Sequence, residues 1–124
     1  MKRFIFRFAR TSLGGLLISW IFSNMSFVLP VKRLHETDNW LAFHHPQPSH
    51  KVHILIVPKR NYHSILDVPS SDSVFLQDLF DLVGELVKEF DLEQRGYRLL
   101  TNGGAYQDVD HLHFHLISDT DQAT

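Results

Sequence analysis

The segment DHLHFHLIS, residues 110–118, alternates histidine with apolar residues. His111, His113 and His115 stand at every second position, with leucine or phenylalanine between and after them. Successive side chains of a β-strand point to opposite faces of the sheet. The segment therefore predicts a strand with one apolar face towards a core and three imidazoles on the other face. Such a row is typical of a metal site, a phosphate site or a catalytic relay.

The chain of 124 residues is long enough for one domain with its own core and too short for two. Hydrophobic residues make up 44% and charged residues 21%, as in soluble globular proteins. The net charge of −2 gives no reason to expect nucleic acid as a partner. Cysteine is absent, which excludes disulfides and thiolate zinc sites and fits a cytoplasmic protein. A zinc site made of histidines stays open.

Basic residues are concentrated at the start of the chain. Residues 1–33 contain six lysines and arginines and no acid, whereas residues 34–124 contain six bases and fourteen acids. All nine histidines also follow residue 34. We therefore divide the chain into an N-terminal segment, residues 1–30, and a domain, residues 31–124.

The N-terminal segment predicts an amphipathic helix over residues 3–22. Arg3, Arg7 and Arg10 share one helical face, and Gly14-Gly15 is a weak point. The apolar run is shorter than the roughly 20 residues that span a bilayer. We expect a docking element that packs on its own domain or on a second subunit. Contact with a membrane surface and a signal sequence are the alternatives.

Alternating and β-branched patterns predict four more strands. They cover residues 32–37, 39–45, 52–59 and 97–102, with a turn at residues 37–39. The last of them directly precedes the histidine segment, so these two segments should form an antiparallel hairpin.

A long helix is expected between the two halves of the sheet. Ser70 or Ser71 would cap it, Asp72 would lie in its first turn, and Gly96 stands where a helix-ending glycine would. The apolar residues at helical spacing are Phe75, Leu79, Leu82, Val83, Leu86, Val87 and Phe90. The prediction is an α+β fold, with an antiparallel sheet of about five strands, one long helix and an extra N-terminal helix.

The residues before the histidine row favour an anion over a metal. The amides of Asn102 and Gln107 can donate to phosphate oxygens, and Gly103 and Gly104 let backbone come close. Zinc remains the competing interpretation, with His53 of the strand VHILIVPK as a ligand beside the row.

Two segments, TNGGAYQDVDHLHFHLIS and LAFHHPQPSHKVHILIVPKR, resemble the hallmarks of the histidine triad family. The resemblance implies an enzyme that hydrolyses or transfers a nucleotide at its α-phosphate. It implies that His113 attacks phosphorus and forms a nucleotidyl-histidine. His115 would donate a hydrogen bond to the phosphate or the leaving group, His111 would support the site from its edge, and His53 would complete the cluster.

The resemblance also implies residues that bind the substrate. Asn102 and Gln107 would hold phosphate oxygens. Leu41 and Phe43 either belong to the core or line a pocket for the base. His45 aligns with the position that often holds an aspartate for the ribose hydroxyls, and the remaining histidines, His35, His44, His50 and His63, are assigned to the surface.

The expected substrates are dinucleoside polyphosphates or nucleoside phosphoramidates, and the expected assembly is a homodimer. No metal is required by this mechanism, although Mg²⁺ is compatible with polyphosphate substrates. Asp108 departs from the family, in which a serine or threonine usually follows the glutamine. The alternatives are a nucleotide-binding module without turnover and a histidine-ligated zinc protein.

Overall fold

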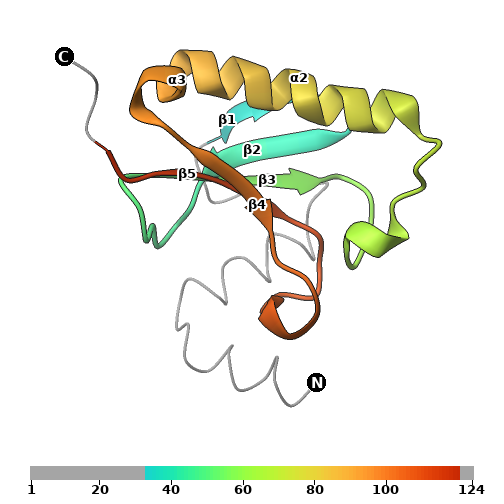
Figure 1. The fold of residues 1–124 in the computed structure, drawn as a ribbon. Helices are drawn as coiled ribbons and strands as arrows, with labels where there is room; N and C mark the ends of the chain where they lie inside the picture. The colour runs from blue at the N-terminus through green and yellow to red at the C-terminus, as the bar shows by residue number, and fades with distance from the viewer. Residues whose placement is uncertain (1–32, 121–124) are drawn as a thin grey trace.

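A computed structural model describes residues 33–120, in which three strands precede one long helix and two strands follow it (Figure 1). The sheet has five antiparallel strands in the order β1-β2-β3-β5-β4. These strands are β1 (Arg33–Glu36), β2 (Trp40–His44), β3 (Val52–Pro58), β4 (Arg98–Thr101) and β5 (Phe114–Ser118). The helices are α2 (Ser73–Glu89) and the short α3 (Leu92–Arg95), with 3-10 turns η1 (Ile65–Asp67) and η2 (Gly104–Tyr106). The predicted α+β architecture and the β4–β5 hairpin are thus confirmed.

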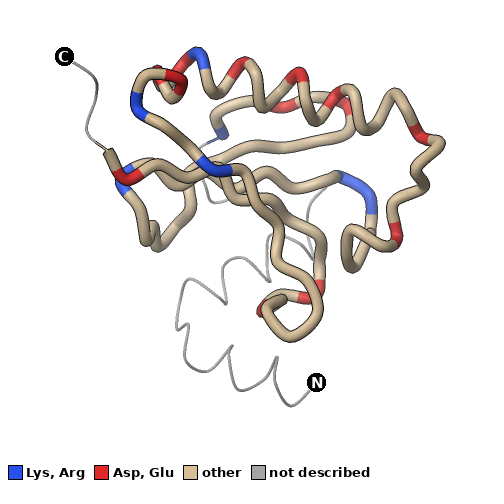
Figure 2. The backbone as a smooth tube through the Cα atoms, viewed as in Figure 1, with Lys and Arg blue, Asp and Glu red and all other residues tan. Residues whose placement is uncertain are grey.

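The predicted N-terminal helix, residues 3–22, lies outside the described residues. Among residues 33–120, no helix is long and apolar enough to cross a membrane. Acidic residues follow one another along α2, so that side of the helix faces water (Figure 2).

The core lies between α2 and one face of the sheet. Trp40 of β2 is 1% exposed, and its ring stacks on Phe75 of α2 with centroids 4.6 Å apart. The indole Nε1–H donates to the Phe75 carbonyl over 2.9 Å, so this buried polar group is satisfied. Each large side chain fully buried here contributes roughly 1.5–3 kcal/mol. This packing holds α2 against one face of the sheet. The side chains that the described strands place on the opposite face do not contact α2.

The helix boundaries differ from the predicted ones at both ends. Asp72, and neither serine, is the N-cap of α2, because its carboxylate accepts the Phe75 N–H. The helix α2 ends at Glu89, and two residues later Asp91 adopts a left-handed conformation with φ 55°. Gly96, with φ 86°, does end a helix, but that helix is α3.

The histidine segment is only partly a strand, which corrects the predicted span of residues 110–118. β5 begins at Phe114, so of the three histidines only His115 belongs to the sheet. Upstream, the Leu112 N–H donates to the Tyr62 carbonyl over 2.9 Å. The His113 ring bonds the His111 carbonyl, and this local bond competes with a regular strand. The row therefore bends before it enters the sheet.

Candidate active site

The sheet face opposite α2 carries the chemistry-bearing side chains of β3, β4 and β5. His53 of β3 pairs with Ile117 of β5, and Leu100 of β4 pairs with His115 of β5. Directly paired residues of antiparallel strands point to the same face. The four side chains therefore form a compact group, with an imidazole at two of its corners.

His53 and His115 are joined in a directed chain of hydrogen bonds. The Ser49 backbone N–H donates to His53 Nδ1 over 3.0 Å, and His53 Nε2 lies 2.9 Å from His115 Nδ1. Because His53 Nδ1 accepts, a neutral His53 carries its proton on Nε2 and donates it to His115 Nδ1. The proton of His115 is then on Nε2. That buried atom has no hydrogen-bond partner among the described residues, so it is a donor ready for a ligand.

His113 has the opposite tautomer. Its Nδ1 lies 2.7 Å from the His111 carbonyl oxygen, which can only accept, so the proton is on Nδ1 and the lone pair on Nε2. The Thr101 hydroxyl donates to the His113 carbonyl over 2.7 Å and fixes the backbone from β4. The rings of His113 and His115 lie 5.0 Å apart at 65°. The site thus places one imidazole lone pair beside one imidazole N–H donor.

Burial keeps these rings neutral. Desolvation, with smaller effects from neighbouring imidazoles, lowers the pKa of His115 to about 3 and that of His53 to about 4. Burial also lowers the pKa of His113, although a hydrogen bond to His111 and the charge of Asp108 act against it. A neutral imidazole is the form that acts as a nucleophile.

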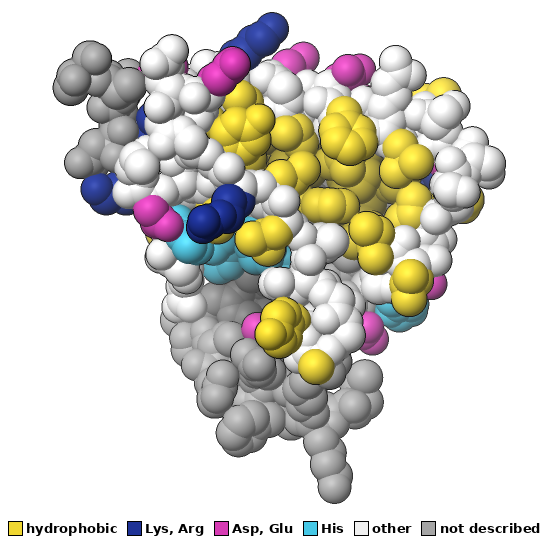
Figure 3. Space-filling model, in the orientation of Figure 1, with side chains coloured by type: hydrophobic (Ala, Val, Ile, Leu, Met, Phe, Trp, Pro, Cys, Tyr) yellow, Lys and Arg dark blue, Asp and Glu magenta, His cyan; other side chains and the backbone are white. Residues whose placement is uncertain are grey.

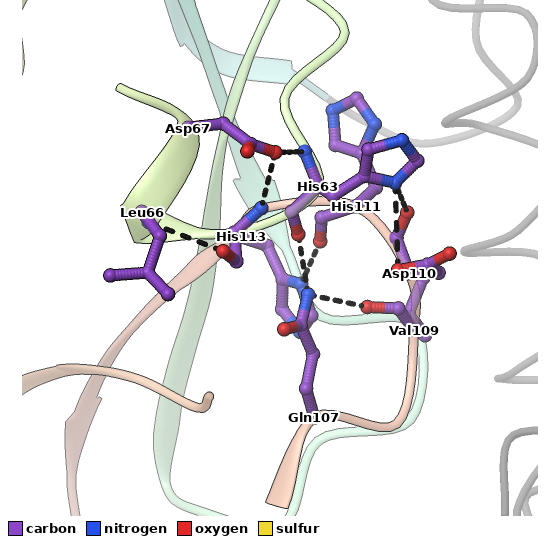
Figure 4. Close-up of polar contacts among 9 residues, drawn as sticks. His63, Leu66, Asp67, Gln107, Val109, Asp110, His111 and His113 are labelled. Carbon is purple, nitrogen blue, oxygen red and sulfur yellow. Dashed lines mark hydrogen bonds and ion pairs between the residues drawn. The ribbon is translucent and has the colours of Figure 1, made fainter. Parts of the chain in front are cut away.

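His111 lies in the loop that enters β5, two residues before His113. It is 5% exposed, and burial lowers its pKa although a hydrogen bond with the Pro58 backbone opposes this. Figure 4 shows it beside His63 and Asp110. His63 bonds the Asp110 carbonyl over 3.3 Å.

The two residues expected to bind phosphate, Asn102 and Gln107, have different surroundings. Asn102 lines a pocket of about 170 Å³ together with His53 and His115. The Gln107 amide instead donates to the carbonyls of His63, over 2.6 Å, and Val109, over 3.1 Å (Figure 4). Gln107 thus ties its loop to the segment before η1, and its amide N–H groups are engaged by the protein.

The glycines of this loop have different roles. Gly104 begins η2 with φ 56°, a backbone conformation that residues with a Cβ rarely adopt. Gly103 is extended, and a Cβ there would meet no atom within 4 Å. Only Gly104 is therefore required by the backbone.

The residues expected around the base and ribose are mostly enclosed. Leu41 and Phe43 are 2% and 0% exposed, and they alternate along β2 with Trp40 and Ala42 of the core cluster, so both are buried on the opposite face of the sheet. His45 joins the histidine cluster, with its ring 4.3 Å from that of His53. Its Nδ1 accepts the Gln47 N–H over 2.9 Å, and burial lowers its pKa to about 4.

One histidine assigned to the surface belongs near the site. The His50 ring lies 5.1 Å from that of His53, and its Nδ1 lies 2.8 Å from the Asp119 carboxylate. The sequence signal was its position three residues before His53, in the loop that enters the same strand. His35 does lie elsewhere and bonds Glu89 of α2 over 2.7 Å.

Within residues 33–120, no three His, Asp or Glu side chains are arranged to hold a metal. Both ring nitrogens of His53 already take part in hydrogen bonds, so it could ligate zinc only by losing one of them.

The fold and this histidine arrangement define a HIT-type domain, and comparison with known proteins agrees. The family model of the HIT domain matches residues 26–122. The chain therefore belongs to the HIT domain family.

Its relatives include bacterial and yeast proteins. A HIT-like protein of Helicobacter pylori is 35% identical over 92 residues, which cover 73% of this chain and 86% of that protein. The adenosine 5'-monophosphoramidase of Candida albicans is 36% identical over 104 residues, covering 77% and 66%.

Solved structures show the same fold. A histidine triad protein from Clostridium difficile matches 87% of this chain and 93% of its own, with a TM-score of 0.71 and 28% identity. A HIT family hydrolase from Legionella pneumophila matches 85% and 93%, with a TM-score of 0.70 and 32% identity.

Proposed function

We propose that the protein hydrolyses or transfers nucleotides at the α-phosphate through a nucleotidyl-histidine on His113. The observation that carries this proposal is the pair of opposite tautomers, a lone pair on His113 Nε2 beside a proton on His115 Nε2. One group is set to attack and the other to donate. The substrate class follows the phosphoramidase activity of the yeast relative and the family resemblance.

In the first step, His113 Nε2 attacks phosphorus. The Nε2–P bond forms while the bond to the leaving group breaks, and the leaving group takes that electron pair. The His115 Nε2–H hydrogen-bonds the leaving atom and can give it a proton. The His113 ring becomes positive, and its Nδ1–H remains on the His111 carbonyl. The negative charge of Asp108, which raises the pKa of His113, also favours the positive ring.

In the second step, a water molecule attacks the same phosphorus. The Nε2–P bond breaks, its electron pair returns to His113, and a nucleoside monophosphate leaves. The water supplies the new P–O bond and releases one proton, which replaces the one that His115 donated. An alcohol or a phosphate in place of water would give transfer instead of hydrolysis.

The test is turnover of adenosine 5'-phosphoramidate and of diadenosine triphosphate, with and without a chelator, measured as AMP formed. His113→Ala should abolish turnover, because loss of an obligate nucleophile costs many orders of magnitude. Rapid quenching of the unmodified protein should trap a base-stable, acid-labile adduct on His113. An adduct that maps to another residue, or normal rates for His113→Ala, would refute the mechanism.

A nucleotide-binding module without turnover is the second candidate. One side-chain oxygen of Asp108 is buried, and its charge acts on His113. A carboxylate at this place repels a phosphate unless the positive ring compensates it. Nucleotide binding without AMP release in the same assay would favour this candidate.

We also propose a homodimer that forms through the β4 edge. β4 ends the sheet, so among the described strands its outer side has no partner. Apolar side chains gather between α2 and this edge (Figure 3). Two exposed aromatic side chains belong to these elements: Phe80 of α2 is 65% exposed, and Tyr97, which directly precedes β4, is 47% exposed. Two-fold pairing of this surface would cover both copies in the same way.

A further inference from the structure

The pocket beside His115 continues along β5 towards a basic side chain that the mechanism does not yet use. Ile117 is two residues beyond His115 on the same face of β5, and it lines both the pocket at His115 and a second pocket of about 270 Å³. Arg98 of β4 pairs directly with Ile117 and lines the second pocket. The two hollows are therefore neighbours along one strand.

The register places Arg98 within reach of a group bound at His115. Arg98 and Leu100 point to the same face, and Leu100 pairs with His115. Diagonal neighbours across two antiparallel strands have Cβ atoms roughly 7–8 Å apart. The Arg98 side chain is exposed, and an extended arginine is long enough to span that gap. Within residues 33–120, Arg98 forms no ion pair, whereas Arg33 and Arg60 are each paired with a carboxylate.

The direction of the reaction leads towards Arg98. In an in-line displacement, the leaving group departs on the side of phosphorus opposite the nucleophile. In the proposed mechanism the leaving group lies at His115 Nε2–H, and the pocket at His115 is also lined by Leu100 and Ile117, so an extended leaving group has room along β5. The next side chains on that path are the apolar Ile117 and Leu100, followed by Arg98.

We propose that Arg98 is a specificity-determining residue that binds an anionic leaving group, the phosphate chain of a dinucleoside polyphosphate. This inference rests on the proposed function. Guanidinium groups bind phosphate oxygens through two parallel hydrogen bonds, which an uncharged amine leaving group cannot accept. Leu100 and Ile117 exclude water beneath the chain and strengthen the charge contact.

One acid at the rim opposes an anion. Asp119 lies at the end of β5, where it bonds His50 and interacts with the charge of Arg98. Figure 2 shows the basic start of β4, and Figure 3 shows histidines beside one basic and one acidic side chain. The hydrogen bond with His50 and the charge of Arg98 both lower the pKa of Asp119, so this carboxylate stays charged. Removing that charge should therefore favour polyphosphate substrates.

The experiment compares kcat/KM for diadenosine triphosphate and adenosine 5'-phosphoramidate. Arg98→Ala should lower the polyphosphate value about 10- to 100-fold, the range of a lost charge-assisted hydrogen bond, and leave the phosphoramidate value unchanged. Arg98→Lys keeps the positive charge but cannot form the two parallel hydrogen bonds of a guanidinium, so its kcat/KM for the polyphosphate should be intermediate. Asp119→Asn should raise only the polyphosphate value. Arg33→Ala removes the same charge from β1, at the opposite edge of the sheet, and should change neither.

Equal losses on both substrates, or no loss with either, would overturn the role of Arg98. An unmodified protein that cleaves the phosphoramidate but not the polyphosphate would overturn it as well, while the proposed function would stand. Failure to cleave either substrate would overturn both. Unchanged thermal unfolding of Arg98→Ala would show that a selective loss does not come from misfolding.

Discussion

The Nε2 atom of His53 lies 2.9 Å from the Nδ1 atom of His115, so two neighbouring strands share a hydrogen bond between imidazoles. Its direction is set by the Ser49 N–H, which occupies the other nitrogen of His53. A backbone amide in a loop thereby determines which nitrogen of His115 carries the proton. His53 acts through His115, so it is a positioning residue.

We predict that His53→Phe lowers kcat about 10- to 100-fold. The variant loses the hydrogen bond to His115 Nδ1, so the proton of His115 is no longer held on Nε2. His53→Gln should restore part of the rate, because its amide can donate to His115 Nδ1. Nitrogen NMR of histidine-labelled protein should show a changed proton position on His115 in the phenylalanine variant only. If both variants lose rate equally while His115 keeps its tautomer, the relay is not the reason.

We predict that stability falls as the pH decreases below the ordinary histidine pKa. The pKa is lowered to about 4 for His53 and to about 3 for His115, whereas the unfolded chain binds protons near pH 6.5. The preference of the folded state for neutral rings therefore contributes fully to the free energy of unfolding above about pH 6.5. This contribution is lost as the pH falls from about 6.5 towards 4. Each ring accounts for at most about 1.4 kcal/mol per pH unit. Urea unfolding at pH 7 and pH 5 measures this, and His53→Phe should reduce the difference.

The sequence predicted the fold well because its signals are local and repeated. Helical spacing from Phe75 to Phe90 and the β-branched run of β3 each recur over many residues. The bend before β5 was missed because it depends on a ring-to-carbonyl bond at His113 and on Tyr62. A period-two pattern carries no information about such contacts.

The candidate site was predicted less completely than the fold. Motif position indicated His113, His115 and His53, but not the inward placement of His50, which depends on how its loop folds back. Gln107 was expected to face the phosphate, yet its amide donates to two backbone carbonyls. Competition among hydrogen-bond partners is a tertiary property, and no single residue type reveals its outcome.

Asp108 should tune the nucleophile, and we predict a split effect for Asp108→Asn. Its negative charge raises the pKa of His113, so removing it should move the acid limb of the kcat/KM profile to lower pH. The same change removes a repulsion on the phosphate and should lower KM. Asp110→Asn, in the same loop, is the matched control. An acid limb unchanged in both variants would contradict the coupling.

Trp40 should be a major determinant of stability. It is 1% exposed, stacks on Phe75 and donates to the Phe75 carbonyl. Trp40→Ala should lower the free energy of unfolding by about 3–5 kcal/mol, because it leaves a cavity and an unpaired carbonyl. Tyr106→Ala, at a residue that is 76% exposed, should change it by less than about 0.5 kcal/mol. Urea denaturation of the two variants checks this difference.

The apolar surface at the β4 edge should determine the oligomeric state. Phe80 is 65% exposed on α2, and a glutamate there would place two like charges near the proposed two-fold axis. Sedimentation at micromolar concentration should show a dimer for the unmodified chain and a monomer for Phe80→Glu. Val74→Glu makes the same change in the first turn of α2, at a residue that is 69% exposed. This control should leave the dimer intact, and a monomeric unmodified chain would refute the assembly.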